Sequence, residues 1–564
     1  MDLRNVIFAI ALSFAVLFGW SVIFESPQIQ EQIQDQDQKT QDLDAPSVNI
    51  EKKDISIISR DDAIKSSKRI SFENNNVVGS ISLKGALIDD ITFKKHSETI
   101  GSEKKVTYLN PEKTKEGYFI ETGWAANNIE SLTLPNKDTL WKVKGNNKLS
   151  NNNPVIIEWS NNSGLVFRKK IELDNKFLFK VTQEIQNKSE NTVELYPYAQ
   201  ITRNQKPTLE AGSMSGTLIL HDGFIGVFDE DLKEYDYDDI EDKKKEHNAE
   251  SGWLGITDKY WITALVPDKN QSFKGEFVYK SDSYKANYII NKPIVIKPTS
   301  SKTSKTKIFV AAKEVKTIDG YAQSENINKF DLTIDWGWLY FLTKPLFFVI
   351  NYLFELTKNF GIAIVLVTAA VRLMFFPLAN YSFRSMAKMK ILQPELLRLK
   401  ELHKEDKVKL QQEMMALYKR EKVNPLSGCL PILIQIPFFF AIYKMLLISL
   451  EMRHQPFFGW IKDLSAQDPT SIFNIFGLIP WDPPSFLIIG AWPIMMGTTM
   501  YLQQKLNPTP PDPIQAKIFM FFPLFLTIIL APFPAGLVVY WTINNVLTIA
   551  QQWVIMKTTT VKTK

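Results

Sequence analysis

The sequence predicts a polytopic α-helical membrane protein with six transmembrane helices, a large all-β sandwich outside the membrane and a cytoplasmic helical hairpin. Three observations support this fold class. Uncharged apolar runs gather at the two ends of the 564-residue chain, although hydrophobic residues make up only 45% of it. Short alternating runs typical of strands fill the region between these ends, and one internal loop is strongly basic.

The N-terminal segment, residues 1–24, is predicted to be a signal-anchor helix. Val6–Phe24 is uncharged and long enough to cross about 30 Å of hydrocarbon, with Arg4 before it. The alternative is a cleavable signal peptide, but the apolar run is longer than such a peptide needs and no small-x-small cleavage site follows it. Residues 25–54 are rich in glutamine and acidic residues, which predicts a disordered linker.

Residues 55–332 are predicted to form the β-sandwich. This region is polar and carries short alternating runs such as Val155–Trp159 and Phe177–Val181, without a long amphipathic helix. The acidic stretch Asp229–Asp242 lacks the ligand spacing of a calcium loop and is interpreted as a solvated loop. The only cysteine of the chain is Cys429, so the domain must be stable without an intrachain disulfide.

The next segment, residues 333–360, is predicted to be an amphipathic helix in the membrane interface, because its many aromatic residues surround scattered charges. Residues 361–382 are predicted to be transmembrane helix 2, and Arg372 lies inside this apolar run. An arginine stays protonated and costs about 2.5–3.5 kcal/mol at the middle of a membrane on insertion scales. We therefore expect a hydrated cavity around Arg372, or else a structural cation bonded to helix-end carbonyls or lipid phosphate.

The remaining membrane segments follow from hydropathy and from proline positions. The block 518–556 is uncharged, too long for one crossing and interrupted at Pro532–Gly536, so it is predicted to contain transmembrane helices 5 and 6. The other predicted segments are transmembrane helix 3 (426–450), an external loop (451–484), transmembrane helix 4 (485–504) and a cytoplasmic loop (505–517).

The distribution of basic residues predicts the orientation. Residues 383–422 have the apolar spacing of a two-helix hairpin and hold eleven Lys and Arg, and the tail 557–564 is also basic. The hairpin and both termini are therefore expected in the cytoplasm. Methionine side chains adapt to varied apolar partners, so those of the hairpin are candidate contact residues, although the stripe they belong to could simply close the hairpin. They are Met386, Met389, Met414 and Met415.

Several segments of the membrane block resemble the YidC/Oxa/Alb family of membrane protein insertases, in the Gram-negative form with a large periplasmic domain. These segments are Ser385–Met389, Gln412–Lys419, Asn424–Pro431, Asp463–Pro469 and Phe533–Trp541. The resemblance implies an inner-membrane insertase, not an enzyme, whose five core helices enclose a hydrophilic groove that opens to the cytoplasm and to lipid. It places the large β domain in the periplasm.

The resemblance also implies particular residues and partners. The positions that match the family's groove are Arg372, Thr368, Gln435 and Trp541, of which the last is tyrosine or tryptophan among members. The implied partners are nascent membrane proteins, the Sec translocon, the lipid bilayer, and the ribosome and targeting factors at the hairpin and tail. No cofactor, metal, catalytic residue or DNA contact is expected.

Two other classes of function compete with this interpretation. An intramembrane arginine also suits a transporter or channel for an anionic solute, although no paired broken-helix repeat is visible in the sequence. A large β-sandwich also suits an envelope enzyme acting on sugars, but its histidines show neither a metal-binding nor a triad pattern. These histidines are His96, His221 and His247.

Overall fold

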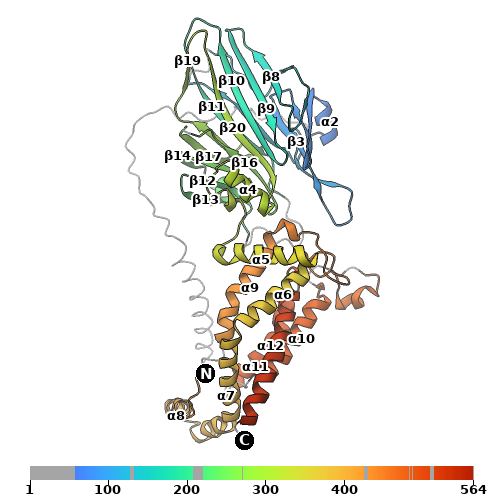
Figure 1. Cartoon of the computed structure of the whole chain (residues 1–564), viewed down its shortest axis with the longest axis vertical. Coiled ribbons are helices and arrows are strands. Elements are labelled where there is room, and N and C mark those ends of the chain that lie inside the picture. The colour runs from blue at the N-terminus through green and yellow to red at the C-terminus, as the bar shows by residue number, and fades with distance from the viewer. Residues whose placement is uncertain are drawn as a thin grey trace. The chain divides into compact units, whose positions relative to one another are not determined.

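The computed structural model describes residues 57–127, 132–207, 220–269, 271–424, 430–481, 483–484, 487–507 and 513–562. The predicted signal-anchor helix and nearly all of the predicted linker lie outside these residues. The described chain holds a domain of strands and a block of helices (Figure 1).

The β domain is built from two large sheets, as the short alternating runs predict. The strands of the first sheet are β1 (Arg69–Glu73), β2 (Val77–Ser82), β3 (Leu87–Ser97), β4 (Lys105–Leu109), β5 (Tyr118–Ala125), β7 (Lys148–Leu149), β11 (Val193–Arg203), β14 (Lys245–Ala249), β17 (Phe273–Lys280), β18 (Ser283–Ile290) and β19 (Ile294–Ile296). The strands of the second sheet are β6 (Lys142–Lys144), β8 (Val155–Ser160), β9 (Leu165–Leu173), β10 (Leu178–Asn187), β12 (Gly223–Phe228), β13 (Asp231–Tyr235), β15 (Gly252–Thr257), β16 (Trp261–Val266) and β20 (Ser301–Ala312).

Neighbouring strands pair antiparallel in both sheets, except that β1 and β7 are parallel. In the first sheet the order is β14-β17-β18-β11-β5-β3-β2-β1-β7, with β19 beside β11 and β4 beside β3. In the second it is β13-β12-β15-β16-β20-β10-β9-β8-β6. Along β9, buried residues alternate with partly exposed ones, which is the pattern of a strand with one face on a core. The domain is therefore a β-sandwich.

Aromatic side chains join the two sheets across this core. Phe72 of β1 meets Phe179 of β10 edge to face, with ring centroids 5.2 Å apart. Phe93 of β3 stacks on Trp261 of β16 at 4.8 Å. Because aromatic pairs bury large areas and prefer these geometries, they stabilise the contact between the sheets.

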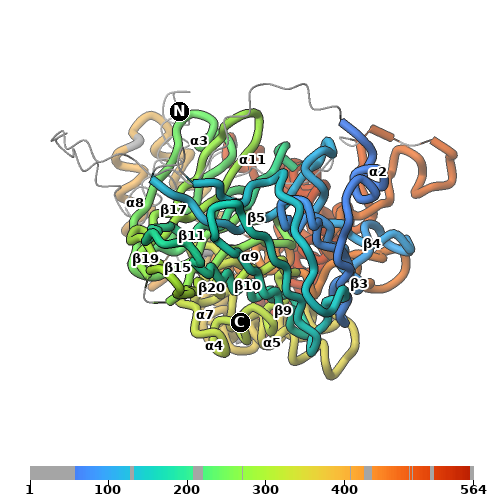
Figure 2. Tube along the Cα trace, turned by 90° about the horizontal axis from the view of Figure 1, so that it is seen from above, coloured from blue at the N-terminus to red at the C-terminus, as the bar shows by residue number. Residues whose placement is uncertain are grey.

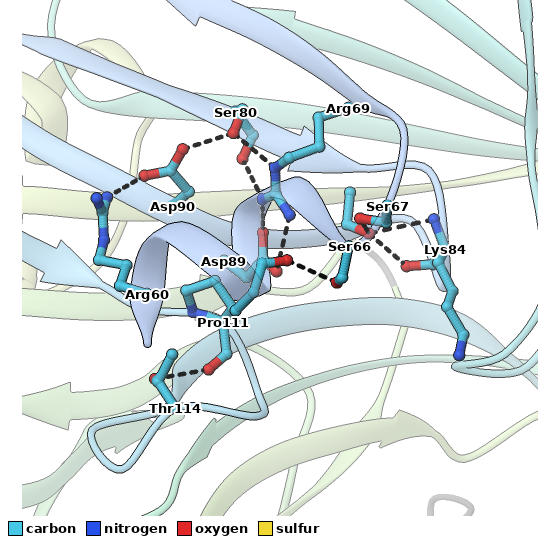
Figure 3. A network of polar contacts seen from close by, with 12 residues as sticks. Arg60, Ser66, Ser67, Arg69, Ser80, Lys84, Asp89, Asp90, Pro111 and Thr114 are labelled. Atoms are coloured by element: carbon cyan, nitrogen blue, oxygen red, sulfur yellow. Dashed lines mark hydrogen bonds and ion pairs between the residues drawn. The ribbon is translucent and has the colours of Figure 1, made fainter. Parts of the chain in front are cut away.

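A buried polar network ties the first three strands to the short helix α2 (Arg60–Lys65) (Figure 3). Arg69 forms an ion pair with Asp89, and the side chains of both residues are almost fully buried. The Arg69 Nε also donates to Ser80 Oγ at 2.7 Å, and Arg60 pairs with Asp90. Each charge in the network thus has a partner of opposite charge.

The acidic stretch Asp229–Asp242 is ordered, contrary to the expectation of a solvated loop. It contains the edge strand β13 and the helix α3 (Tyr237–Asp242), whose Tyr237 and Ile240 are buried. These two apolar side chains anchor the stretch to the domain, while most of its carboxylates remain in solvent.

Helices make up the rest of the described chain. After α4 (Val315–Ser324) and the 3₁₀ turn η2 (Phe330–Thr333), they are α5 (Tyr340–Thr357), α6 (Phe360–Met374), α7 (Phe376–Leu402), α8 (Lys407–Arg420), α9 (Leu430–Ile448), α10 (Ala491–Leu506), α11 (Pro513–Leu530) and α12 (Ala535–Lys562). The short 3₁₀ helices η4 (Leu450–Met452) and η5 (Ile472–Gly477) lie between α9 and α10. Helix α12 contacts α6, α7, α9 and α10 and is therefore central to the block.

The helix predicted over 361–382 is interrupted. Helix α6 ends at Met374, and α7 starts at Phe376 after a bend of 68° and continues to Leu402. Pro377 stands in the first turn of α7, where it has no backbone N–H to continue the hydrogen bonds of α6. Among the described residues no single helix meets the length and hydropathy expected of a membrane span, whereas α6 and α7 meet them together.

The other helix boundaries follow the breaks in the sequence. Residues 531–534 separate α11 from α12, at the prolines that interrupt the uncharged block. Residues 403–406 separate α7 from α8, so the basic region contains two helices. Helix α5 has an exposed apolar surface, as an interfacial helix would have.

Candidate functional site

A cavity lies around Arg372, between α6, α7, α9 and α12. Its volume open to water-sized molecules is about 50 Å³, which is room for a small number of waters. Most of its wall is apolar, and the polar side chains that reach it are those of Thr368, Arg372, Gln435, Tyr540 and Asn544. A cavity among helices thus lies beside the arginine, and its few polar side chains gather around the guanidinium.

Arg372 reaches this cavity from the last turn of α6 and is held by neutral acceptors. Its Nε donates to Asn544 Oδ1 of α12 at 2.8 Å, and its Nη2 donates to Gln435 Oε1 of α9 at 3.1 Å. Within the described part of the chain, no carboxylate pairs with it. Because amide oxygens carry no net charge, the site keeps the positive charge of the guanidinium.

Thr368 lies one helical turn before Arg372, on the same face of α6. The residue is buried and lines the cavity. Its hydroxyl donates to the backbone oxygen of Ile364 at 2.7 Å, so its proton is already used. What Thr368 offers to a guest in the cavity is therefore an acceptor oxygen.

Trp541 does not line the cavity around Arg372, in contrast to the other three predicted groove residues. Its ring meets Phe439 edge to face at 4.7 Å and packs beside the buried cluster of Met496, Leu530 and Val538. The neighbouring Tyr540 points into the cavity instead. A shift of one residue along a helix turns the side chain by about 100°, which accounts for the difference.

Sequence reasoning missed Asn544 and Tyr540. Asn544 is buried in α12 and supplies the shortest hydrogen bond to Arg372. One signal was available, because Asn544 is a polar residue inside an uncharged segment and lies one turn after Tyr540. Polar side chains within membrane helices usually face the interior of a bundle.

The four methionines of the hairpin do not share one surface. Met386 is buried with Ala379 and Phe383 against Ile555 of α12, and Met389 packs on the same cluster. Met414 is partly exposed on α8, and Met415 is 47% exposed. In this conformation Met415 is the most exposed of the four.

Lys444 of α9 does not line the cavity around Arg372. Its Nζ donates to Asp335 Oδ2 at 2.6 Å, just before α5. The ammonium thus lies near the C-terminal end of α9 and pairs with the segment that precedes α5.

A bent helix pair with the length and hydropathy of a membrane span, beside a cavity that contains an arginine without a carboxylate partner among the described residues, is the pattern of a helical membrane protein. Two family models match the chain, the YidC periplasmic domain over residues 69–349 and the 60Kd inner membrane protein over residues 352–563. The chain therefore belongs to the YidC family of membrane protein insertases, whose members are inner-membrane proteins with a periplasmic domain.

Relatives of this family match over the whole chain. The membrane protein insertase YidC of Pelagibacter ubique (strain HTCC1062) is 56% identical over 100% of both chains. That of Methylorubrum extorquens (strain PA1) is 43% identical and covers 100% of this chain and 96% of its own. This family is not one of enzymes, and it does not favour the transporter or channel.

Among solved structures, a crystal structure of an active YidC insertase with its first transmembrane domain resolved is similar over 88% of this chain and 93% of its own. The sequence identity is 17% and the TM-score is 0.35.

Proposed function

We propose that this insertase uses the cavity around Arg372 to move short hydrophilic segments of nascent membrane proteins across the membrane and releases their transmembrane helices sideways into lipid. The observation that supports the proposal is the set of partners of Arg372, which are the neutral amides of Asn544 and Gln435. A structural arginine would be stabilised best by a carboxylate, whereas a cation with neutral partners stays available to a guest.

The cavity lowers the free-energy cost of moving a polar segment of the client through the membrane. A peptide-like group transferred to hydrocarbon without a hydrogen bond costs about 2–7 kcal/mol, so even a few such groups oppose translocation strongly. Arg372 attracts acidic or polar groups of the client, and the amides of Gln435 and Asn544 exchange hydrogen bonds with its backbone. The acceptor oxygen of Thr368 adds one further site.

The apolar part of the client supplies the free energy. Burial of apolar surface in lipid contributes roughly 25 cal/mol per Å², so a transmembrane helix offsets the passage of a short polar segment. Leu373 and Met374, which follow Arg372 in the chain, are 72% and 62% exposed and provide an apolar route outward. Trp541, packed outside the cavity on Phe439, is proposed to contact the emerging helix from the lipid side.

The proposed topology has six transmembrane helices, of which five form the core, with both termini in the cytoplasm and the β-sandwich in the periplasm. The high density of Lys and Arg in residues 383–422 supports this orientation through the positive-inside rule. The β-sandwich is proposed to contact the Sec translocon.

Substitution of Arg372 tests the proposal. The purified chain is reconstituted in liposomes, and protease-protected insertion of a single-span client with a short acidic segment is measured. Loss of a charged hydrogen bond costs about 1.5–3 kcal/mol, so Arg372→Ala is expected to reduce the insertion rate at least about tenfold. Arg372→Lys keeps the charge and is expected to retain most activity.

The matched control is Arg384→Ala, which removes an arginine exposed on α7 outside the cavity and is expected to leave insertion unchanged. Equal insertion by the wild type and Arg372→Ala would contradict the proposed role of the cation. No insertion by the wild type would contradict the insertase mechanism as a whole.

The cytoplasmic hairpin and tail are proposed to bind the ribosome and targeting factors, with Met414 and Met415 as the accessible apolar contacts. Deletion of α8 together with the tail 557–564 is expected to weaken cosedimentation with ribosomes, because it removes basic residues that contact RNA phosphates. The binding should also decrease as salt increases. Unchanged cosedimentation would contradict this contact.

A further inference from the structure

The external segment between α9 and α10 ends in an exposed apolar tip. From Thr470 to Gly490 the only ionisable residue is Asp482. We define the apolar tip as the exposed side chains Phe473, Ile475, Phe476, Leu478 and Trp481, of which Leu478 is 81% exposed. Large apolar side chains gathered on one surface loop mark a binding surface rather than a loop that serves only as a connection.

Hydrogen bonds to a buried carboxylate fix the position of the loop that carries the tip. The buried carboxylate of Asp468 accepts hydrogen bonds from Trp460 Nε1 at 3.1 Å, from the backbone N–H of Thr470 at 3.0 Å and from that of Trp492 at 2.9 Å. Since Trp492 lies in the first turn of α10, this carboxylate joins the loop to the helix end.

The two ends of the loop are also joined to each other. The Ser471 hydroxyl donates to Leu487 O at 2.8 Å, and Ile472 N donates to Ile489 O at 3.1 Å. These polar groups thus form hydrogen bonds within the protein, and the tip presents apolar side chains outward.

The backbone of the tip adopts a conformation that these residues rarely take. Ile475 has φ 50° and ψ 51°, and Phe476 has φ 55° and ψ 35°, both in the left-handed region. A β-branched or bulky residue is disfavoured there. In this conformation the side chains of Ile475 and Phe476 are exposed rather than packed against the protein.

The segment that holds the tip also contacts the junction of α5 and α6. The Asn359 side chain, between α5 and α6, donates to Phe457 O at 3.4 Å, and Phe457 packs on Trp492 with ring centroids 5.9 Å apart. The segment that holds the tip is therefore fixed to the junction of α5 and α6 and to the start of α10. Figures 1 and 2 both show the orange segment before α10 extending outward from the helices.

We propose that the apolar tip is embedded in the outer leaflet of the bilayer, with lipid acyl chains as its partner. Exposed apolar side chains also occur on α5 and α10, such as Phe341 and Leu502. The absence of charge from most of the segment suits hydrocarbon, and Trp481 suits the boundary with the headgroups. The tip and α5 then form two lipid contacts on the external side of the core.

Spin labelling of the full chain in liposomes of phosphatidylethanolamine and phosphatidylglycerol tests the proposal. Cys429→Ser removes the native thiol, and Phe476→Cys carries a nitroxide. Its accessibility to oxygen, which concentrates in lipid, is compared with its accessibility to a water-soluble nickel chelate. Leu502→Cys on α10 is the lipid-facing control, and Lys104→Cys in the β domain is the water-facing control.

The label at Phe476 is expected to resemble that at Leu502, with an oxygen-to-nickel ratio severalfold above that at Lys104. A ratio equal to that at Lys104 would place the tip in water and overturn the proposal. Low accessibility to both reagents would show that protein covers the tip, which also overturns it. Leu478→Cys repeats the measurement if the first variant does not fold.

This inference rests on the proposed topology, in which α9 and α10 cross the membrane, and not on the role of Arg372. The control at Leu502 reports separately on that topology, because a water-exposed label there would contradict the membrane placement of α10 itself. The depth of the label is independent of client insertion, so the two proposals fail in different experiments.

Discussion

Two arginines, one in each region of the molecule, differ in their partners. Arg69 of the β-sandwich is buried and paired with the carboxylate of Asp89. Arg372 of the helical block is partly buried and bonded to the amide oxygens of Asn544 and Gln435. In the sandwich the charges cancel, whereas in the cavity one positive charge remains.

The difference distinguishes an arginine with a structural role from an arginine whose charge can interact with a client. A buried ion pair is expensive to break, because either partner left alone is an uncompensated charge in a medium of low polarity. A cation held by amides can exchange these hydrogen bonds for hydrogen bonds to a guest, and the amides it releases carry no charge that would be left uncompensated. The comparison predicts that substitution of Arg69 changes stability, and that substitution of Arg372 changes insertion.

The largest effect on stability is expected for Arg69→Ala, which leaves Asp89 buried without its partner. The free energy of opening of β1 to β3, measured by hydrogen exchange on the full chain, should fall by about 3–5 kcal/mol. Lys94→Ala is the matched control, because Lys94 pairs with Glu73 at 2.6 Å but both side chains are well exposed. The Lys94→Ala variant should lower this free energy of opening by less than about 1 kcal/mol. Equal losses in the two variants would contradict the structural role of the buried pair.

A smaller effect is expected for Asn545→Ala, which removes a polar contact between membrane helices. Asn545 Nδ2 donates to Thr499 Oγ1 at 3.2 Å and joins α12 to α10 away from the cavity. Such contacts contribute about 0.6–2 kcal/mol, so the thermal unfolding midpoint in detergent should fall slightly while insertion per folded molecule is retained. Val546→Ala, at an exposed neighbouring position, controls for side-chain volume. Loss of insertion without loss of stability would place Asn545 in the functional site.

Much of the fold could be predicted from local patterns. Alternating apolar residues predicted strands such as β8 and β10, and prolines predicted the break between α11 and α12. The break at Phe375 was not predicted, because hydropathy runs through it without change and only Pro377 marks it. The helix α3 was missed because two buried side chains, Tyr237 and Ile240, order an otherwise acidic stretch.

The site was predictable in part. Arg372 stood out because a charge in an apolar run has few explanations, and Thr368 and Gln435 also line the cavity. Asn544 depends on a contact between residues 172 positions apart, which no local pattern specifies. The direction of Trp541 depends on how α12 is rotated against α9, and that rotation follows from packing rather than from sequence spacing.

Substitution of Asn544 tests most directly the claim that Arg372 acts as an unneutralised cation. Asn544→Asp places a carboxylate where an amide oxygen lies 2.8 Å from Arg372 Nε, and Asn544→Ala removes the hydrogen bond but adds no charge. Insertion of the acidic client into liposomes is measured for both variants. The account predicts that Asn544→Asp lowers insertion towards the level of Arg372→Ala, and that Asn544→Ala lowers it less than Asn544→Asp because no negative charge is added. Insertion by Asn544→Asp at the rate of the wild type would contradict the account, because the cation would then be neutralised without consequence.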